Sequence, residues 1–546
     1  MKRLACLAVL LPVLSAQPTP KADACSPPPG AVPPTLPAKL LEGQGGAHFK
    51  ITTTSAEAQK FFDQGISQLH SFWVREAERS FLQAAALDPE APMPQFGIAM
   101  VAAGDYRPGF QLDLVNGVNP KKPEPRKEAP SGGEARAIAA AKKALELSAI
   151  PGRATDIEKS YIAAAFARRD ITAADPNIGY IKALRQLLEK HPKEVEARLY
   201  LALHIMSGFE TPDKKPREGS MESAQLLRGL LKDAPNHPGA HHFVIHGFEG
   251  STFAKDAWPS CKRYGEMASN IPHGLHMPGH IYAQTGRWAD AEKAFAGAAK
   301  NEVYWMNEDS LAGNGHHGHN VHFLAMSLSF QGKYDEAEKT ARGLLAYKET
   351  PREAKQADNY RTAYRQGWFA LMRTLVQHEK WDLILDGATL PAHDKPREQA
   401  WRQWAMALAK LAKGEREPAR ALERDMASTL DEVRKIARNN SHRPLVVAHE
   451  ELRAHLKLHT GDTEGALKDL EAAAKNEIAL RYNEPTSYPR PVYEILGQAA
   501  LKLGKAELAE RAFRSALDQY PESASAKRGL EAAQAAPRRP TEAAGR

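Results

Sequence analysis

Apolar and small residues recur along most of this chain at the three- and four-residue spacing of an amphipathic helix. Between Phe61 and Pro89 the pattern resolves into two helices, each of about a dozen residues, joined by a short turn. Almost no segment alternates apolar and polar residues between turn residues, so little β structure is expected. The pattern therefore predicts an all-α fold.

The two-helix pattern is repeated along the chain. In the first copy, Gly65, Ala77, Phe81 and Pro89 hold positions typical of the tetratricopeptide repeat, a helical hairpin with a period of about 34 residues. Further copies lie at 286–295, 332–338, 461–466 and 504–513. Each hairpin leaves an apolar face that only its neighbour can cover, so the copies must stack continuously.

This recurrence predicts a right-handed α-solenoid over residues 51–530, with at least eight hairpins and helix above about 55% of residues. Degenerate copies are expected at 133–235 and 351–430. The stretch 106–133 is rich in proline, lysine and glycine and reads as an insertion between helices.

The two ends of the chain differ from the repeats. A short apolar run after Lys2 and Arg3 predicts a signal peptide at 1–16, and with it a periplasmic or secreted protein. Dense prolines predict an extended linker at 17–50, and 531–546 is expected to be a flexible tail. No later run approaches the length of a transmembrane helix, so no membrane span is expected.

The composition limits the kinds of partner and metal site that the chain can have. The net charge of +7 is spread over alternating acidic and basic residues, so nucleic acid is not an expected partner. The cysteines Cys6, Cys25 and Cys261 have no CxxC spacing, which excludes a thiolate zinc cluster. Histidine is unusual, because eleven of 21 lie between His237 and His322, where an even spread would place about three.

The clustered histidines share a repeat register. His242, His276 and His322 each stand fifteen residues before the small residue of the following helix. Four residues further on stand His246, His280 and Met326, so HxxxH occurs twice at an offset of 34 residues. His273 and His319 stand three residues before His276 and His322. We expect this stripe to face the concave groove of the solenoid, away from the packing positions.

Imidazoles in this arrangement are suited to a transition ion, with zinc or copper favoured and iron a further option. The predicted ligands are His242, His246, His276, His280, His319 and His322, meeting at a common ion. Glu249 and Glu451 are predicted proton-transfer groups, because the register places them toward the same groove. A second interpretation is a polar groove that binds peptide through hydrogen bonds. His70 fits either packing or a groove role.

Several short sequence segments resemble segments of a group of secreted bacterial tetratricopeptide proteins that are rich in histidine. They are 69–73 (LHSFW), 240–246, 276–282 (HMPGHIY), 319–323 (HNVHF) and 482–485 (YNEP). The resemblance spans most of 50–530 and implies the solenoid fold and one histidine constellation, but it implies no particular activity.

Two functions therefore compete. The first is a metal-dependent hydrolase or oxidase that acts on a small extracellular substrate. The second is a scaffold without catalysis that holds a peptide or protein in the groove, which is the commonest use of such arrays. The sequence defines no oligomeric state, and a nucleophilic triad has no support because G-x-S-x-G is absent.

Overall fold

The computed structural model describes residues 36–106, 129–308, 315–348, 362–437, 440–480 and 484–537. Helices make up 71% of it, above the predicted 55%. In these ranges the only β feature is an isolated bridge between Phe209 and Pro216. None of the helices there combines the length and apolar character that a membrane span needs. The predicted all-α solenoid is confirmed.

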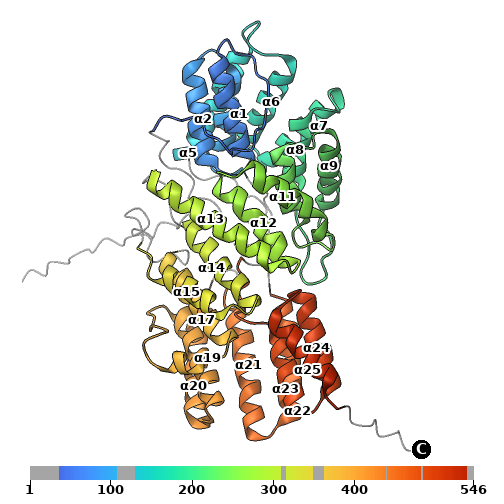
Figure 1. Ribbon diagram of the computed structural model, residues 1–546. Coiled ribbons are helices and arrows are strands. Elements are labelled where there is room, and N and C mark those ends of the chain that lie inside the picture. Colours follow the sequence, from blue (N-terminus) through green and yellow to red (C-terminus); the bar gives the residue numbers. More distant parts are fainter. Residues whose placement is uncertain are drawn as a thin grey trace, which may run out of the picture.

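In Figure 1, α1 lies near the top, α12 to α14 lie in the middle, and α19 to α25 occupy the lower half. In chain order the helices are α1 (Ala56–His70), α2 (Val74–Leu87), α3 (Pro92–Val101), α5 (Gly132–Ser148), α6 (Asp156–Arg168), α7 (Pro176–Lys190), α8 (Val195–Ile205), α9 (Ser220–Asp233), α10 (Pro238–Phe248), η1 (Ala254–Ala257), α11 (Trp258–Met267), α12 (Pro272–Gln284), α13 (Trp288–Glu308), α14 (Gly315–Phe330), α15 (Tyr334–Leu345), α17 (Ala363–Gln377), α18 (Trp381–Leu385), α19 (Pro396–Ala412), α20 (Arg416–Ile436), α21 (Arg443–Thr460), α22 (Thr463–Ile478), α23 (Val492–Lys502), α24 (Ala506–Gln519) and α25 (Ala524–Ala535).

Three hairpins close on a glycine in the first helix and a phenylalanine in the second. A Cβ atom added at Gly279 would lie 2.6 Å from the ring of Phe295, so only glycine lets the two helices approach this closely. The same pairing recurs in the first and last parts of the array, at Gly65 with Phe81 and at Gly497 with Phe513. The repeat positions recognised in the sequence are thus the contacts that hold the hairpins together.

The N-terminal segment packs against the middle of the array. The backbone N–H of Gly45 donates to the carbonyl of Met267 at 2.9 Å, and that of Asn270 donates to the carbonyl of Gly43 at 3.0 Å. Ala47 and Phe49 are buried. The packed chain therefore begins inside the stretch that the prolines suggested as a linker, because its last residues form hydrogen bonds with the α11–α12 turn.

The C-terminal repeats also return to the middle of the array. Trp288, at the start of α13, donates its indole N–H to the carbonyl of Pro521 at 2.7 Å. The rings of Phe330 and Tyr520 stack with centroids 4.9 Å apart. The described N-terminal segment therefore packs on the α11–α12 turn, and the C-terminal repeats pack on the start of α13 and on α14.

The other predicted boundaries fall partly outside the described residues. The signal peptide at 1–16 lies outside them, as do residues 107–128 of the insertion and 538–546 of the tail. Tyr106, at the start of the predicted insertion, is buried, and α5 begins at Gly132. At the other end, α25 continues to Ala535 and buries Ala533.

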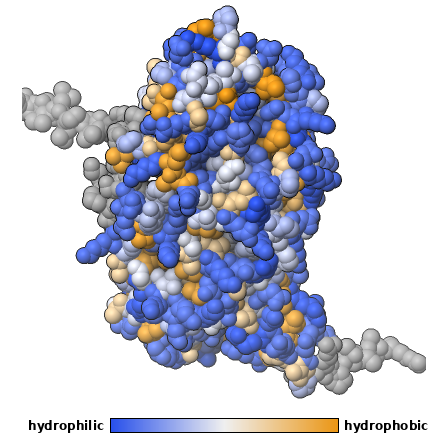
Figure 2. All heavy atoms as spheres, turned by 45° about the horizontal axis from the view of Figure 1, so that its top comes forward, coloured by the Kyte–Doolittle hydropathy of each residue, from blue (hydrophilic) through white to orange (hydrophobic). Residues whose placement is uncertain are grey.

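The surface is largely hydrophilic on the face drawn in Figure 2, with hydrophobic residues in small groups between the charged ones. Most of the apolar residues of the repeats are instead enclosed between successive helices.

We expect Gly286→Ala to destabilise the protein more than Gly504→Ala. Both glycines end a first helix with positive φ, 83° and 69°, so an alanine at either position costs about 1–2 kcal/mol in backbone strain. At Gly286 the new Cβ would also lie 2.8 Å from the carbonyl oxygen of Pro521, whereas nothing lies within 4 Å at Gly504. Urea unfolding measures the difference, and equal losses would contradict a tight closure at Pro521.

Candidate metal centre

The clustered histidines lie on α10, α12 and α14, at the centre of the molecule (Figure 1). Residues four apart share one face of a helix, so each HxxxH presents two imidazoles side by side. These side chains are buried, with exposed fractions of 0% for His242 and His276 and 5% for His319. The side chains predicted to line the concave groove are therefore buried here, with Phe72 beside His242 and Glu484 beside His280.

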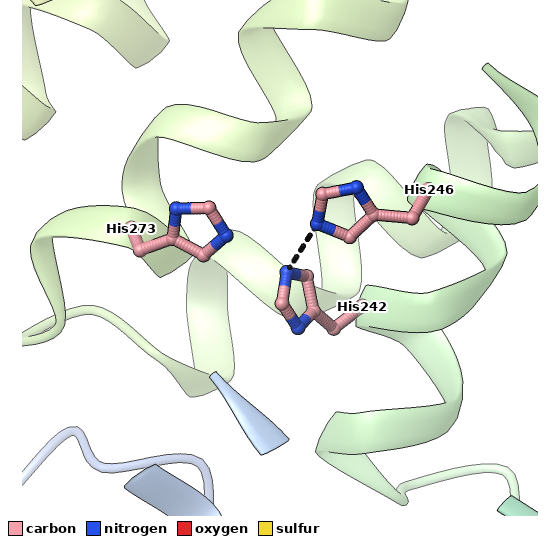
Figure 3. Close-up of side chains that lie close together, drawn as sticks. All are labelled: His242, His246 and His273. Carbon is pink, nitrogen blue, oxygen red and sulfur yellow. Dashed lines mark hydrogen bonds between the residues drawn. The ribbon is translucent and has the colours of Figure 1, made fainter. Parts of the chain in front are cut away.

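The first cluster, here called the first trio, consists of His242, His246 and His273. His242 and His246 come from α10 and His273 from α12, and their rings point toward one another in Figure 3. The Nε2 atoms of His242 and His246 are 3.0 Å apart. One ligand atom from each of the three lies within 4.8 Å of the others, close enough for all three to bind one ion.

A backbone contact fixes the orientation of His242. Its Nδ1 lies within hydrogen-bond distance of the carbonyl oxygen of His70. A carbonyl only accepts, so Nδ1 carries the hydrogen and Nε2 keeps its lone pair. That lone pair is directed into the trio. This is the arrangement in which a metal-binding histidine is held by a partner outside the coordination shell.

Aromatic rings surround the first trio. Phe72, in the turn after α1, has a φ of 54°, a left-handed conformation that bulky residues rarely adopt. Its ring centroid lies 4.7 Å from that of His242 and 5.2 Å from that of His246. On another side, Tyr264 of α11 stacks on His242 with centroids 4.8 Å apart. The α1–α2 turn thus covers the first trio.

The second trio consists of His276 and His280 of α12 with His319 of α14. The Nε2 atoms of His276 and His280 are 2.5 Å apart, and one ligand atom from each of the three residues lies within 4.8 Å of the others. Burial lowers the pKa of His276 well below its usual range, and the nearby His280 lowers it further. The imidazole of His276 is therefore neutral, as a metal ligand must be.

Two carboxylates lie behind the second trio. The Nδ1 atom of His280 is 3.2 Å from an oxygen of Glu249 and 3.5 Å from an oxygen of Glu484. An N–H at Nδ1 toward these oxygens leaves the lone pair of Nε2 directed at His276. Glu249, predicted as a proton-transfer group, therefore lies at the outer nitrogen of His280. In this position it supports the imidazole.

The two trios are built by one rule. Each takes an HxxxH pair from one helix and a single histidine from the next first helix of the array. That single histidine is His273 in the first trio and His319 in the second, each three residues before the next repeat position. The sequence predicted one constellation around a common ion. The structure divides it into two sites, because α12 lies between α10 and α14.

His316 lies beside both trios. Its ring centroid is 5.8 Å from that of His273 and 4.9 Å from that of His276. The Nδ1 atom is 3.4 Å from an oxygen of Glu302. His316 lies in the first turn of α14.

His322 and Glu451 do not join the trios. His322 turns toward α17, where its Nδ1 lies 2.7 Å from Oε1 of Gln366. Glu451 of α21 accepts hydrogen bonds from Tyr488 and from Arg490, the latter at 2.5 Å. Burial alone would raise the pKa of Glu451, but the charge of Arg490, together with His455 and the hydrogen bond from Tyr488, outweighs it and holds that pKa at about 2. Glu451 is an ionised structural group, because the segment after Glu484 folds onto α21.

A further group joins His70, Glu196 and His237. Both histidines donate from Nε2 to Glu196, at 2.8 and 2.9 Å. Burial alone would raise the pKa of Glu196, but its interactions with the two imidazoles outweigh burial and hold that pKa well below its usual range. His237 also accepts the N–H of Ala240 at Nδ1, 3.4 Å away, so its hydrogen stays on Nε2.

This tautomer distinguishes the group from the trios. In His242 and His280 the outer nitrogen faces an acceptor, so the inner one offers a lone pair. In His237 the outer nitrogen faces a donor, so the inner one offers a hydrogen. We interpret His70, Glu196 and His237 as a clamp that ties α1, α8 and α10 together. His70 therefore takes the packing role that the sequence left open.

Some site residues were not selected from the sequence. His273 was noticed through its spacing from His276 but was not among the predicted ligands. Glu196 carried no signal, and Phe72 and Glu484 stood out only within the segments 69–73 and 482–485, without a role. Each reaches the site through contacts between distant parts of the chain.

No family model matches the chain, and no curated protein matches it. Among solved structures, it is similar to the APC/C hetero-tetramer Cut9–Hcn1 at 11% identity, with 88% of this chain and 90% of that chain covered and a TM-score of 0.27. The P58(IPK) TPR domain matches at 12% identity, 88% and 98% coverage and a TM-score of 0.21. The human IFIT1 dimer with PPP-AAAA matches at 10% identity, 87% and 89% coverage and a TM-score of 0.30. At such low TM-scores, no argument about function rests on these likenesses.

For the clamp, we expect Glu196→Gln to lower the free energy of unfolding by about 1–3 kcal/mol, because a neutral amide cannot accept from both imidazoles. The loss should be the same in chelator and in excess zinc. Thermal and urea unfolding under both conditions measure it. A loss seen only in the presence of metal would instead indicate that the clamp residues bind an ion.

Proposed function

We propose that this protein is a metal-binding solenoid that holds one transition ion in each histidine trio. The observation that carries the proposal is the directed lone pair. A carbonyl behind His242 and carboxylates behind His280 turn the inner nitrogens toward their neighbours within each trio. Buried imidazoles whose inner nitrogens are oriented by groups behind the ring are what a preformed metal site requires.

The spacing of the nitrogens supports the same proposal. Nitrogens bound to one zinc ion at about 2.0–2.1 Å lie roughly 3.3 Å apart in a tetrahedral site. The His242–His246 nitrogens are 3.0 Å apart, and the third ligand atom of each trio lies within 4.8 Å. Small rotations of the rings would complete either site.

The donors favour zinc or copper. Each trio supplies imidazole nitrogen alone, which suits these ions better than the oxygen-seeking calcium and magnesium, and iron is a further option. At the second trio, Glu249 and Glu484 place negative charge next to His280 and so offset the charge of a divalent ion. The proposed location of the protein is the periplasm or the exterior of the cell.

Catalysis is the second candidate. Three protein ligands leave one position on a tetrahedral ion, where a bound metal activates water or binds oxygen. This observation favours hydrolysis or oxidation of a small substrate over a purely structural ion. A peptide scaffold is less favoured around α10 to α14, since Phe72 and Glu484 occupy the side where a peptide would lie.

The test is a count of ions per chain. We expect the wild-type protein, loaded with zinc and dialysed, to hold about two, one for each three-histidine site. The double variants His242→Ala with His246→Ala, and His276→Ala with His280→Ala, should each hold about one. The matched control is His455→Ala with His459→Ala on α21, an HxxxH outside both trios, which should still hold two.

Unfolding should report the same ions. Saturating zinc at a hundredfold excess over Kd stabilises a folded protein by about 2.7 kcal/mol for each site, so both trio variants should lose part of the gain. Circular dichroism of the variants confirms that they are folded. Equal zinc content in all three double variants would contradict the proposal. If the wild type turns over hydrolase or oxidase substrates in a metal-dependent way and the trio variants do not, the protein is an enzyme.

A further inference from the structure

The repeat register that builds the trios continues onto α14. His322 stands where His242 and His276 stand in the two preceding repeats, and Met326 stands where His246 and His280 stand. The third copy of HxxxH is therefore HxxxM. A thioether replaces an imidazole at the same place on the helix.

His322 has the same tautomer as His242. Its Nδ1 lies 2.7 Å from the acceptor Oε1 of Gln366, so Nδ1 carries the hydrogen and Nε2 the lone pair. The residue is only 3% exposed, and its Nε2 has no hydrogen-bond partner among the described residues. A buried lone pair without a donor is costly in a folded protein, unless it serves another ligand.

Met326 lies on the same face of α14 and is also 3% exposed. The same four-residue step brings the inner nitrogens of the trios to 3.0 and 2.5 Å on α10 and α12. The hydroxyl of Thr486, in the segment between α22 and α23, lies 3.9 Å from the sulfur. That segment therefore closes over Met326 as Phe72 closes over the first trio.

We propose that Nε2 of His322 and the sulfur of Met326 bind monovalent copper, Cu(I). A thioether is a soft ligand that selects Cu(I) over zinc, and this ion accepts as few as two or three ligands. The site is separate from the two trios, and it involves no change of oxidation state.

The charge nearby opposes a divalent ion more strongly than a monovalent one. Arg373 is fully buried and donates to the carbonyls of Thr486 and Tyr488. Burial, followed by the charge of Arg373, lowers the pKa of His322 to about 3, so the imidazole is neutral and lies within reach of that charge. The guanidinium repels a divalent ion twice as strongly as a monovalent one at the same distance. The site should therefore discriminate against zinc by charge as well as by softness.

The experiment uses the full chain, first loaded with zinc and then titrated anaerobically with Cu(I) in competition with a chromogenic Cu(I) chelator. We expect one Cu(I) per chain and a copper–sulfur distance in the X-ray absorption spectrum. Met326→Leu, which conserves volume, should lose the copper–sulfur signal and weaken Cu(I) binding at least tenfold, with unchanged zinc content. The matched control Met426→Leu alters another fully buried methionine and should behave as wild type.

Any of three results would overturn the proposal. The protein could bind no Cu(I), or bind Cu(I) with nitrogen neighbours alone. The copper–sulfur signal could also survive Met326→Leu. His322→Gln supplies an independent check and should also abolish the site. The zinc content of the trio variants tests the proposed function separately. A protein whose trios take up no zinc could still show the copper–sulfur signal at Met326.

Discussion

The packing of residues from distant parts of the chain against α10 to α14 is the constraint on which the rest of the structure depends. In an open solenoid the first helices would present their histidines to water, where an imidazole needs no particular partner. Here Gly45 and Phe72 close one end of the histidine-bearing face, and Glu484 and Pro521 close the other. Burial obliges each ring nitrogen to find an acceptor, a donor or an ion. The closure thereby converts a polar stripe into sites of defined chemistry.

Much of the fold could be predicted from the sequence because its determinants are local. Gly279 and Phe295 lie sixteen residues apart, and the same contact recurs at Gly65 with Phe81 and at Gly497 with Phe513. The choice of histidines could also be predicted, since a shared register places His242 and His276 on the same face of successive helices. Their burial could not. It depends on contacts such as that of Phe72 with His242, which no periodic pattern encodes.

The division into two sites was hidden for a related reason. The sequence shows which residues share a face but does not show how far α12 separates α10 from α14. His273 and His276, three residues apart on α12, therefore face different partners, and their ring centroids are 6.0 Å apart. His322 shares the register and yet turns to Gln366, because α17 offers an acceptor at that point. Register determines the face of the helix, and the neighbouring helix determines the partner.

The outer nitrogen of each imidazole gives a physical criterion for separating ligands from structural histidines. His237 and His242 lie within one helical turn and a half of each other, and both are nearly or fully buried. The N–H of Ala240 donates to the outer nitrogen of His237, whereas the outer nitrogen of His242 faces the carbonyl of His70. The first histidine must donate inward, so it suits the carboxylate of Glu196. The second must accept inward, so it suits a cation. A repeat array can thus copy a helix face from one hairpin to the next and change its chemistry through the single group placed behind each ring.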